Sequence, residues 1–262
     1  MTAVLGIDAA WTSTEPSGIA LVERDGVKWR LVRVAASYQA FLFDDNWQVI
    51  RHRGSTPDPL ALLSKTAELT ATPVSIVAID MPLSNKPITG RRVSDNAISS
   101  CYGSRHAGTH TPNQTRPGKL SDDLTLGFAQ AGYPLLTSGG SFPALIEVYP
   151  HPALIELTNA ERRLPYKHAK SRKYWPEESL ADRRHKLLSV WADIVSLLDS
   201  RIEGVSSALP LPDPSSRGFE LKTFEDCLDA VVCAWVGTCV LDGTAKAYGD
   251  ETSAIWVPTT GT

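Results

Sequence analysis

The chain has 262 residues, of which 42% are hydrophobic and 21% are charged, and its formal net charge is −3. This composition excludes wholesale disorder and is typical of one large or two small globular domains. The slight acidic excess excludes a uniformly basic nucleic-acid coat protein, although it allows a local basic patch. The longest strongly apolar stretch, 230–241, is too short to span a bilayer, and the N-terminus does not resemble a signal peptide. We therefore expect a cytoplasmic protein with no membrane partner.

The first part of the chain is dominated by apolar segments of strand length. Five such segments lie at residues 4–8, 17–23, 28–36, 74–80 and 144–149. Asp25-Gly26 marks a hairpin between the second and third segments, and helical patterns precede and follow the fourth. A hairpin meander followed by two right-handed crossovers predicts an α/β fold with a mixed five-stranded sheet in the order 3-2-1-4-5, flanked by helices. Strands 1 and 4 should be parallel neighbours.

The rest of the chain is predicted to be mainly helical. Apolar residues between 187 and 198 recur with the period of an amphipathic helix, and Thr223 is expected to open a last long helix. Residues 254–257 are expected to form a terminal strand. Because no internal repeat or long linker divides the chain, we predict a single domain over residues 1–262.

Two of the predicted central strands end in the same way, in Ile7-Asp8 and Ile79-Asp80. If these strands are parallel neighbours, both carboxylates emerge at one edge of the sheet. Carboxylates that lie close together raise each other's pKa unless a cation lies between them, and a divalent metal is the usual cation. The alternative is that Asp8 and Asp80 are ordinary strand-end residues that turn into loops.

The last helix carries two further carboxylates. Asp226 and Asp229 are three residues apart and so share one face of the helix. Asp229 shares its face with Cys233 and other apolar residues, so its charge requires an ion partner or a metal. Asp226 has an alternative role as a first-turn residue of a capping box that begins at Thr223.

The fifth predicted strand contains one acidic residue, Glu147, within an apolar run. A buried Glu requires a partner. Glu147 is either a fourth metal carboxylate or the partner of an arginine such as Arg91. Tyr149 and His151, which follow it, either line the site or cover an edge of the core.

Four segments, in chain order, carry a resemblance to a known family: 4–11, 78–83, 146–152 and 229–234. With them the chain resembles domain-of-unknown-function family 429, whose members are described as ribonuclease-H-like nucleases. Residues 227–234 are also similar to the final-helix motif of Holliday-junction resolvases. The resemblance implies a ribonuclease-H-like fold with Asp8, Asp80 and Asp229 as metal ligands and Asp226 as a further carboxylate. The fold family usually has Glu on the fourth strand, where this chain has the shorter Asp80.

Two segments of this acidic chain are basic, a predicted loop insertion at about 82–120 and a segment at 161–186. The stretches 86–119 and 161–186 each carry a net charge of +5, and each follows a strand that ends at the expected carboxylate edge. Such asymmetry indicates nucleic acid or another phosphate-bearing ligand, whereas the alternative is a solvated loop. The candidate substrate-binding residues are Arg91, Arg92, Tyr149, His151, Lys167 and Lys170.

The leading hypothesis is therefore a nuclease that hydrolyses phosphodiesters with two Mg²⁺ or Mn²⁺ ions. Its candidate catalytic residues are Asp8, Asp80, Asp226, Asp229 and Glu147. One alternative is a phosphotransferase related to actin and the sugar kinases, although that architecture needs two such sheets and the sequence predicts one. Another is a non-catalytic module that binds nucleic acid or protein on a degenerate fold.

Overall fold

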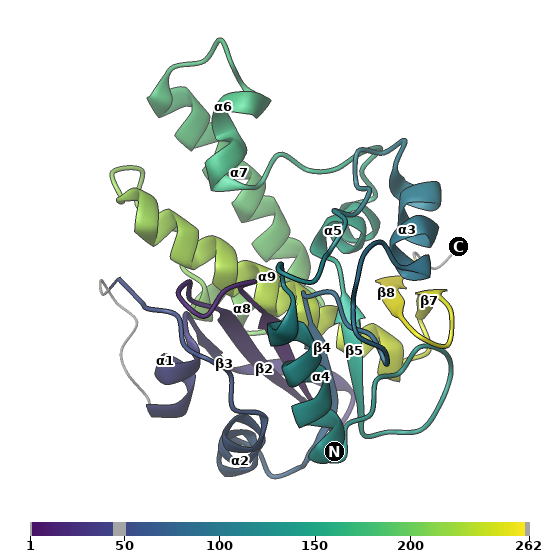
Figure 1. Cartoon of the computed structure of the whole chain (residues 1–262). Coiled ribbons are helices and arrows are strands. Elements are labelled where there is room, and N and C mark those ends of the chain that lie inside the picture. Colours follow the sequence, from purple (N-terminus) through teal and green to yellow (C-terminus); the bar gives the residue numbers. More distant parts are fainter. Residues whose placement is uncertain (1, 44–50, 260–262) are drawn as a thin grey trace.

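A mixed sheet forms the centre of the computed structural model, which describes residues 2–43 and 51–259 (Figure 1). Within these residues the sheet has eight strands in the order β6-β3-β2-β1-β4-β5-β8-β7. Their bounds are β1 (Thr2–Asp8), β2 (Gly18–Asp25), β3 (Lys28–Ala35), β4 (Val74–Ile79), β5 (Ala144–Val148), β6 (Ile202–Glu203), β7 (Ala245–Gly249) and β8 (Ala254–Pro258).

The pairing of β1 with β4 fixes the geometry at the centre of the sheet. β1 is antiparallel to β2 and parallel to β4, with Gly6 opposite Ala78 and Ile7 opposite Ile79. The prediction that these two strands are parallel neighbours is therefore confirmed. The backbone N–H of Asp80 donates to the carbonyl oxygen of Ile7 at 2.8 Å, which continues the pairing beyond the end of β4.

The predicted five-stranded sheet is wrong in its number of strands and therefore in its full order. β6, which has only two residues, pairs with the outer side of β3, and a C-terminal hairpin of β7 and β8 pairs with β5. Both additions have a physical reason, since an open strand edge presents unpaired backbone groups that other segments of the chain can satisfy.

Helices cover both faces of the sheet (Figure 1). Apolar residues of α5, α7 and α9 pack with Val4 and Ile76 on one face, and α1, α2 and α4 pack with Leu5 and Val77 on the other. This alternation reflects the two-residue period of a strand. The helices are α1 (Tyr38–Phe43), α2 (Pro59–Leu69), α3 (Val93–Tyr102), α4 (Lys119–Gln130), α5 (Pro150–Thr158), the 3-10 turn η1 (His168–Lys170), α6 (Ser171–Tyr174), α7 (Leu180–Asp199), α8 (Val205–Ala208) and α9 (Gly218–Leu241). No described helix is long and apolar enough to cross a membrane.

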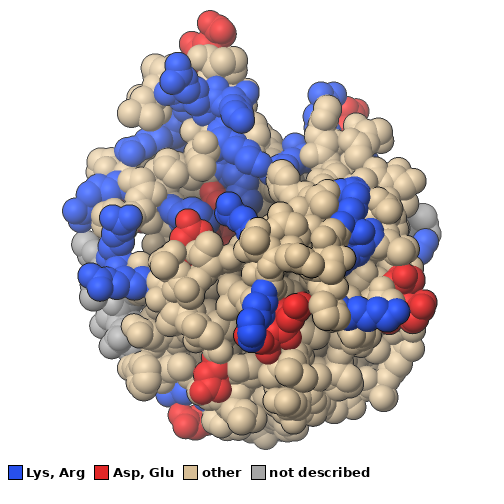
Figure 2. All heavy atoms as spheres, in the orientation of Figure 1, with Lys and Arg blue, Asp and Glu red and all other residues tan. Residues whose placement is uncertain are grey.

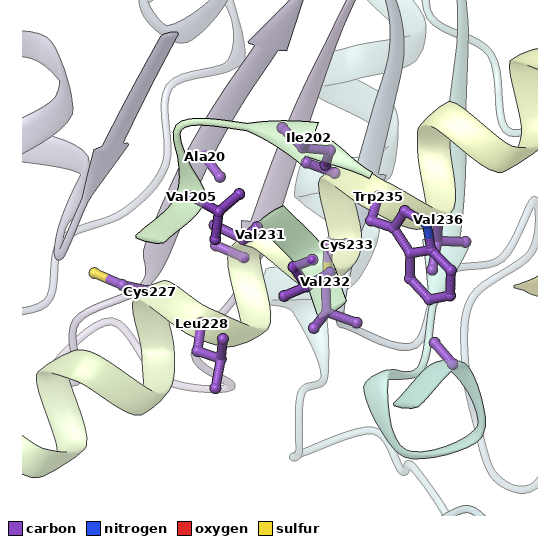
Figure 3. Packing of buried hydrophobic residues seen from close by; sticks show 14 of the residues in the cluster. Ala20, Ile202, Val205, Cys227, Leu228, Val231, Val232, Cys233, Trp235 and Val236 are labelled. Atoms are coloured by element: carbon purple, nitrogen blue, oxygen red, sulfur yellow. The ribbon is translucent and has the colours of Figure 1, made fainter. Parts of the chain in front are cut away.

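Helix α9 lies directly on β1 and β2 because glycines face it. A Cβ atom on Gly6 would collide with the backbone of Ala230 and Ala234, and one on Gly18 would collide with the backbone of Asp226. Apolar residues along the helix fill the layer around this contact, as Figure 3 shows for Cys227, Leu228, Val231, Val232, Cys233 and Val236. The close approach brings the acidic part of α9 beside the end of β1.

The two basic segments are not plain loops. Residues 82–120, predicted as a loop insertion, contain α3, and residues 161–186 contain η1, α6 and the start of α7. The sequence signal for α3 was weak because its ten residues include three serines, an asparagine and an aspartate, which are poor helix formers.

Candidate functional site: a carboxylate cluster at the sheet edge

Asp8 and Asp80 lie at the carboxyl edge of the two central parallel strands. Asp8 is the last residue of β1, and Asp80 directly follows β4. Both side chains are half-buried, so they reach the surface of the site. The shared edge is the arrangement that the two Ile-Asp endings predict.

Helix α9 contributes three buried carboxylates. Asp226 and Glu225 are each 3% exposed, and Asp229 is fully buried. The helix begins at Gly218, and its capping box joins Arg217 to Glu220. The alternative role of Asp226 in a first-turn capping box is therefore wrong, because the residue lies beyond the first turn of a helix that starts earlier than Thr223.

Two lysines neutralise part of this negative charge. Lys167, from the segment between α5 and η1, donates to Asp229 and lies 3.5 Å from Glu225. The hydroxyl of Tyr166 donates to the other oxygen of Asp229 at 2.9 Å. Lys222, one turn before Asp226 on α9, pairs with Asp226 and lies 3.5 Å from Glu225. The α9 carboxylates are thus held by ammonium groups of the chain itself.

The cluster still contains more carboxylates than cations. Burial, together with the charges of Asp229 and Asp226, raises the pKa of Asp8 well above its usual range. Burial and the charge of Asp229 raise the pKa of Asp80 to about 7, and burial raises that of Asp226 to about 6 against the opposing effect of Lys222. A cation placed beside Asp8 and Asp80 would relieve this repulsion.

The donor set fits one hard divalent cation better than it fits two. Asp8 and Asp80 are the members of the cluster with no lysine at ion-pair distance in the described part of the chain. Nowhere in the described part of the chain are three His, Cys, Asp or Glu side chains placed so that they could hold one metal ion. Asp226 or Asp229 could complete such a group only after Lys222 or Lys167 moved away from it.

Glu147 lies beside this cluster in a separate ion pair. It is 3% exposed and accepts hydrogen bonds from Arg92 at 2.5 and 2.8 Å and from the backbone N–H of Leu83 at 2.8 Å. Arg92 also pairs with Asp95 at 2.9 Å. Of the two roles considered for Glu147, the structure has the ion pair, with Arg92 in place of Arg91. Arg91 is exposed and binds Asn96 instead.

Two hollows share Asp8 as a lining residue. One has a volume of about 490 Å³ and is lined by Asp8, Trp11, Asp80, His110 and Arg116 among others. The other, of about 400 Å³, contains Asp8, Arg51, Phe219, Lys222 and Asp226. Figure 2 shows basic side chains gathered beside the hollow between the α6–α7 and α3–α5 parts of the molecule, with acidic groups beneath them.

The remaining predicted residues are Tyr149, His151 and Lys170, of which Tyr149 lines a small recess next to Asp80. The ring of His151 is 7% exposed and lies between Tyr149 and Tyr166, with centroid separations of 5.2 and 5.4 Å. The hydroxyl of Tyr149 donates to the carbonyl of Gly108 at 3.2 Å. Lys170 ends the 3-10 turn η1, beside the cluster that Lys167 enters.

Sequence reasoning missed Lys222 and Glu225 as members of the site, and it missed the contact of Tyr166 with Asp229. A signal existed for Lys222, because it precedes Glu225 by three residues and Asp226 by four, the spacing of ion pairs on one helix face. No local pattern indicates Tyr166, whose partner Asp229 is 63 residues away in the sequence.

Fold and site together define an α/β protein with an acidic centre at the carboxyl edge of its sheet. Residues 134–253 match the model of a family described as Protein of unknown function (DUF429). The matched residues contain β5, the basic segment 161–186 and α9. They therefore include Lys167, Asp226 and Asp229, whereas Asp8 and Asp80 lie outside the match. Comparisons with curated proteins and with solved structures gave no match.

The raised pKa of Asp80 predicts how stability depends on pH when no metal is present. Because its folded-state pKa of about 7 exceeds the usual value of 3.8, the wild type loses stability as the pH rises from about 4 to about 7, and this group causes no further loss above that pH. Asp80→Asn removes this titration. In EDTA, urea unfolding should show the stability of the variant relative to the wild type rising between about pH 4 and about pH 7 and staying constant above that. A difference that is independent of pH would contradict the electrostatic description of the cluster.

Proposed function

We propose that the protein is a ribonuclease-H-like nuclease that hydrolyses phosphodiester bonds of nucleic acid with Mg²⁺ or Mn²⁺. The observation that carries the proposal is the charge imbalance at the sheet edge, where five carboxylates face two lysines and the two accessible carboxylates lack a cation. The five are Asp8, Asp80, Glu225, Asp226 and Asp229. The meander, the parallel β1–β4 pair and the acidic helix laid across them support the ribonuclease-H-like assignment.

In this proposal each part of the site has a distinct task. Asp8 and Asp80 hold the metal, which when bound activates water and stabilises the leaving oxygen. Lys167 and Lys222 keep the buried carboxylates of α9 in place beside it. The basic side chains next to the hollow hold the phosphates of the substrate, and Trp11 provides an aromatic wall.

The experiment combines metal binding with cleavage. Mn²⁺ should bind the wild type in calorimetry and bind Asp80→Asn much more weakly, and Mg²⁺ or Mn²⁺ should support cleavage of labelled DNA or RNA strands. The same preparation should not transfer phosphate from ATP. Phosphate transfer from ATP would favour the phosphotransferase alternative, which the single sheet of the described residues makes the weaker candidate.

A second candidate is a non-catalytic nucleic-acid-binding module. The observation that favours it is the pairing of Asp229 with Lys167 and of Asp226 with Lys222, which satisfies the α9 carboxylates without a metal. Such a module would bind nucleic acid equally well in EDTA and in Mn²⁺, and would leave every strand intact. Metal-dependent cleavage that is lost in Asp80→Asn would exclude it.

A further inference from the structure

Basic side chains gather next to the carboxylate cluster, and some of them have no acidic partner (Figure 2). Arg163 and Lys170 form no ion pair with a carboxylate in the described ranges. Three neighbouring basic residues are paired: Lys167 with Asp229, Lys186 with Glu178 and Arg105 with Glu156. Uncompensated cations in a partly buried position are unfavourable unless an anion joins them.

Two buried polar atoms in this group also lack partners. Within the described residues, Nε of Arg163 and Nδ1 of His151 are buried and make no hydrogen bond. His151 is 7% exposed and packed between two tyrosine rings, so its position is fixed. Because buried polar groups are normally hydrogen-bonded, an unsatisfied guanidinium nitrogen beside unpaired cations indicates a missing acceptor.

Contacts bring these segments into one region: the Tyr149 ring that packs on His151 donates its hydroxyl hydrogen to the carbonyl of Gly108, two residues before His110, and the backbone N–H of Arg163 donates to the carbonyl of Arg105. Burial, Arg163 and Lys167 lower the pKa of Lys170. Burial, Lys170 and Arg163 lower the pKa of His110. Burial, together with the charges of Arg163, Lys167 and Lys170, lowers the pKa of His151. Each group therefore experiences the charge of the others, which an anion of two or more acceptor oxygens would offset.

The region is adjacent to the carboxylates but separate from them. His110 lines the hollow of about 490 Å³ together with Asp8 and Asp80, and it also lines a smaller recess beside Tyr149. An anion held by His110, Lys170 and Arg163 would therefore be the neighbour of a group held at Asp8 and Asp80. Two neighbouring anionic groups joined by a short linkage are the repeating feature of a phosphodiester chain.

We propose that Arg163, Lys170 and His110 form a binding site for a second phosphate of the substrate, next to the phosphodiester that is positioned at Asp8 and Asp80. The inference rests on the proposed function and narrows it. The substrate is then a single nucleic-acid strand with at least two phosphates, and not a mononucleotide. The half-buried Trp11 in the same hollow fits a strand whose bases are free to stack.

The test measures binding without catalysis. A fluorescent ten-nucleotide single-stranded DNA is titrated with full-length protein in EDTA, and anisotropy is recorded at several salt concentrations. Lys170→Gln and Arg163→Gln should each weaken binding about tenfold, as expected for the loss of a charge-assisted hydrogen bond. The double variant should reduce the slope of log affinity against log salt by about 0.7, the value for one phosphate contact on a single strand. Lys186→Gln is the matched control, because Lys186 lies in the same segment but is paired with Glu178.

A second measurement, of melting temperature, shows whether the double variant is folded. Inorganic phosphate should raise the melting temperature of the wild type in EDTA, and should raise that of the double variant less. Without phosphate, the double variant should melt no lower than the wild type, because its removed cations repelled one another. A double variant that binds the oligonucleotide within twofold of the wild type would overturn the site, as would a wild type that binds neither oligonucleotide nor phosphate.

Failure of this site and failure of the proposed nuclease function give different results. Asp8→Asn should bind the oligonucleotide in EDTA at least as tightly as the wild type, because it removes a negative charge from the hollow. If Mn²⁺ binding is absent while the dependence on Arg163 and Lys170 holds, the anion site stands without the nuclease. If Mn²⁺ binds at Asp8 and cleavage occurs while the double variant is unaffected, only the second-phosphate site is excluded.

Discussion

Replacing Asp8 with Asn is expected to reduce metal-dependent cleavage by about a thousandfold, because a side chain that holds the metal loses its charge while keeping its shape. The fold should survive, since the substitution removes one of several repelling carboxylates whose pKa values are raised by burial and by one another. Cleavage of a labelled strand in Mg²⁺, together with the melting temperature in EDTA, measures both effects.

Asp25→Asn is the matched control for this substitution. Asp25 is also the last residue of a strand, but β2 is antiparallel to β1, so Asp25 lies at the opposite edge of the sheet and is exposed. The Asp25→Asn variant should therefore cleave the labelled strand as fast as the wild type does. If Asp8→Asn retains full activity, Asp8 does not hold the metal and the proposed site is wrong.

Replacing Gly6 with Ala is expected to destabilise the protein by about 3 kcal/mol, near the upper end of the usual cost of overpacking a core. The added methyl would collide with backbone atoms of Ala230 and Ala234, which cannot move aside as a flexible side chain can. Helix α9 would have to shift, and Asp229 with it. Urea unfolding gives the loss of stability, and Mn²⁺ binding reports the shift of the site.

Gly139→Ala provides the comparison for this experiment. A Cβ atom on Gly139 meets no other atom within 4 Å, so this variant should differ little from the wild type. A loss below about 0.5 kcal/mol in Gly6→Ala, the range of ordinary surface substitutions, would contradict the seating of α9 on β1.

The central part of the sheet could be predicted from the sequence because its signals are local. The Asp25-Gly26 turn, the continuous apolar run of β4 and the repeated Ile-Asp endings are each readable within a few residues. β6 could not be predicted, since two residues carry no periodicity, and β7 has a lysine and a glycine in five residues. These edge strands form because the tertiary structure offers an open edge.

The candidate site could also be predicted only in part. Strand order brings Asp8 and Asp80 to one edge, and helical spacing brings Asp226 and Asp229 to one face. The sequence could not reveal that Lys167 binds Asp229, because this pairing spans 62 positions and depends on how the segment after α5 folds back. Lys167, predicted to contact substrate, thus has a carboxylate partner that only the tertiary structure defines.

In the proposed site, Asp8 and Asp80 together hold a divalent cation. A crystal soaked in MnCl₂ and measured near the manganese absorption edge tests it most directly, because the anomalous difference map locates the ion itself. We expect a peak within coordination distance of both carboxylates. A soaked crystal with no peak between Asp8 and Asp80, or with manganese bound only elsewhere, would contradict it.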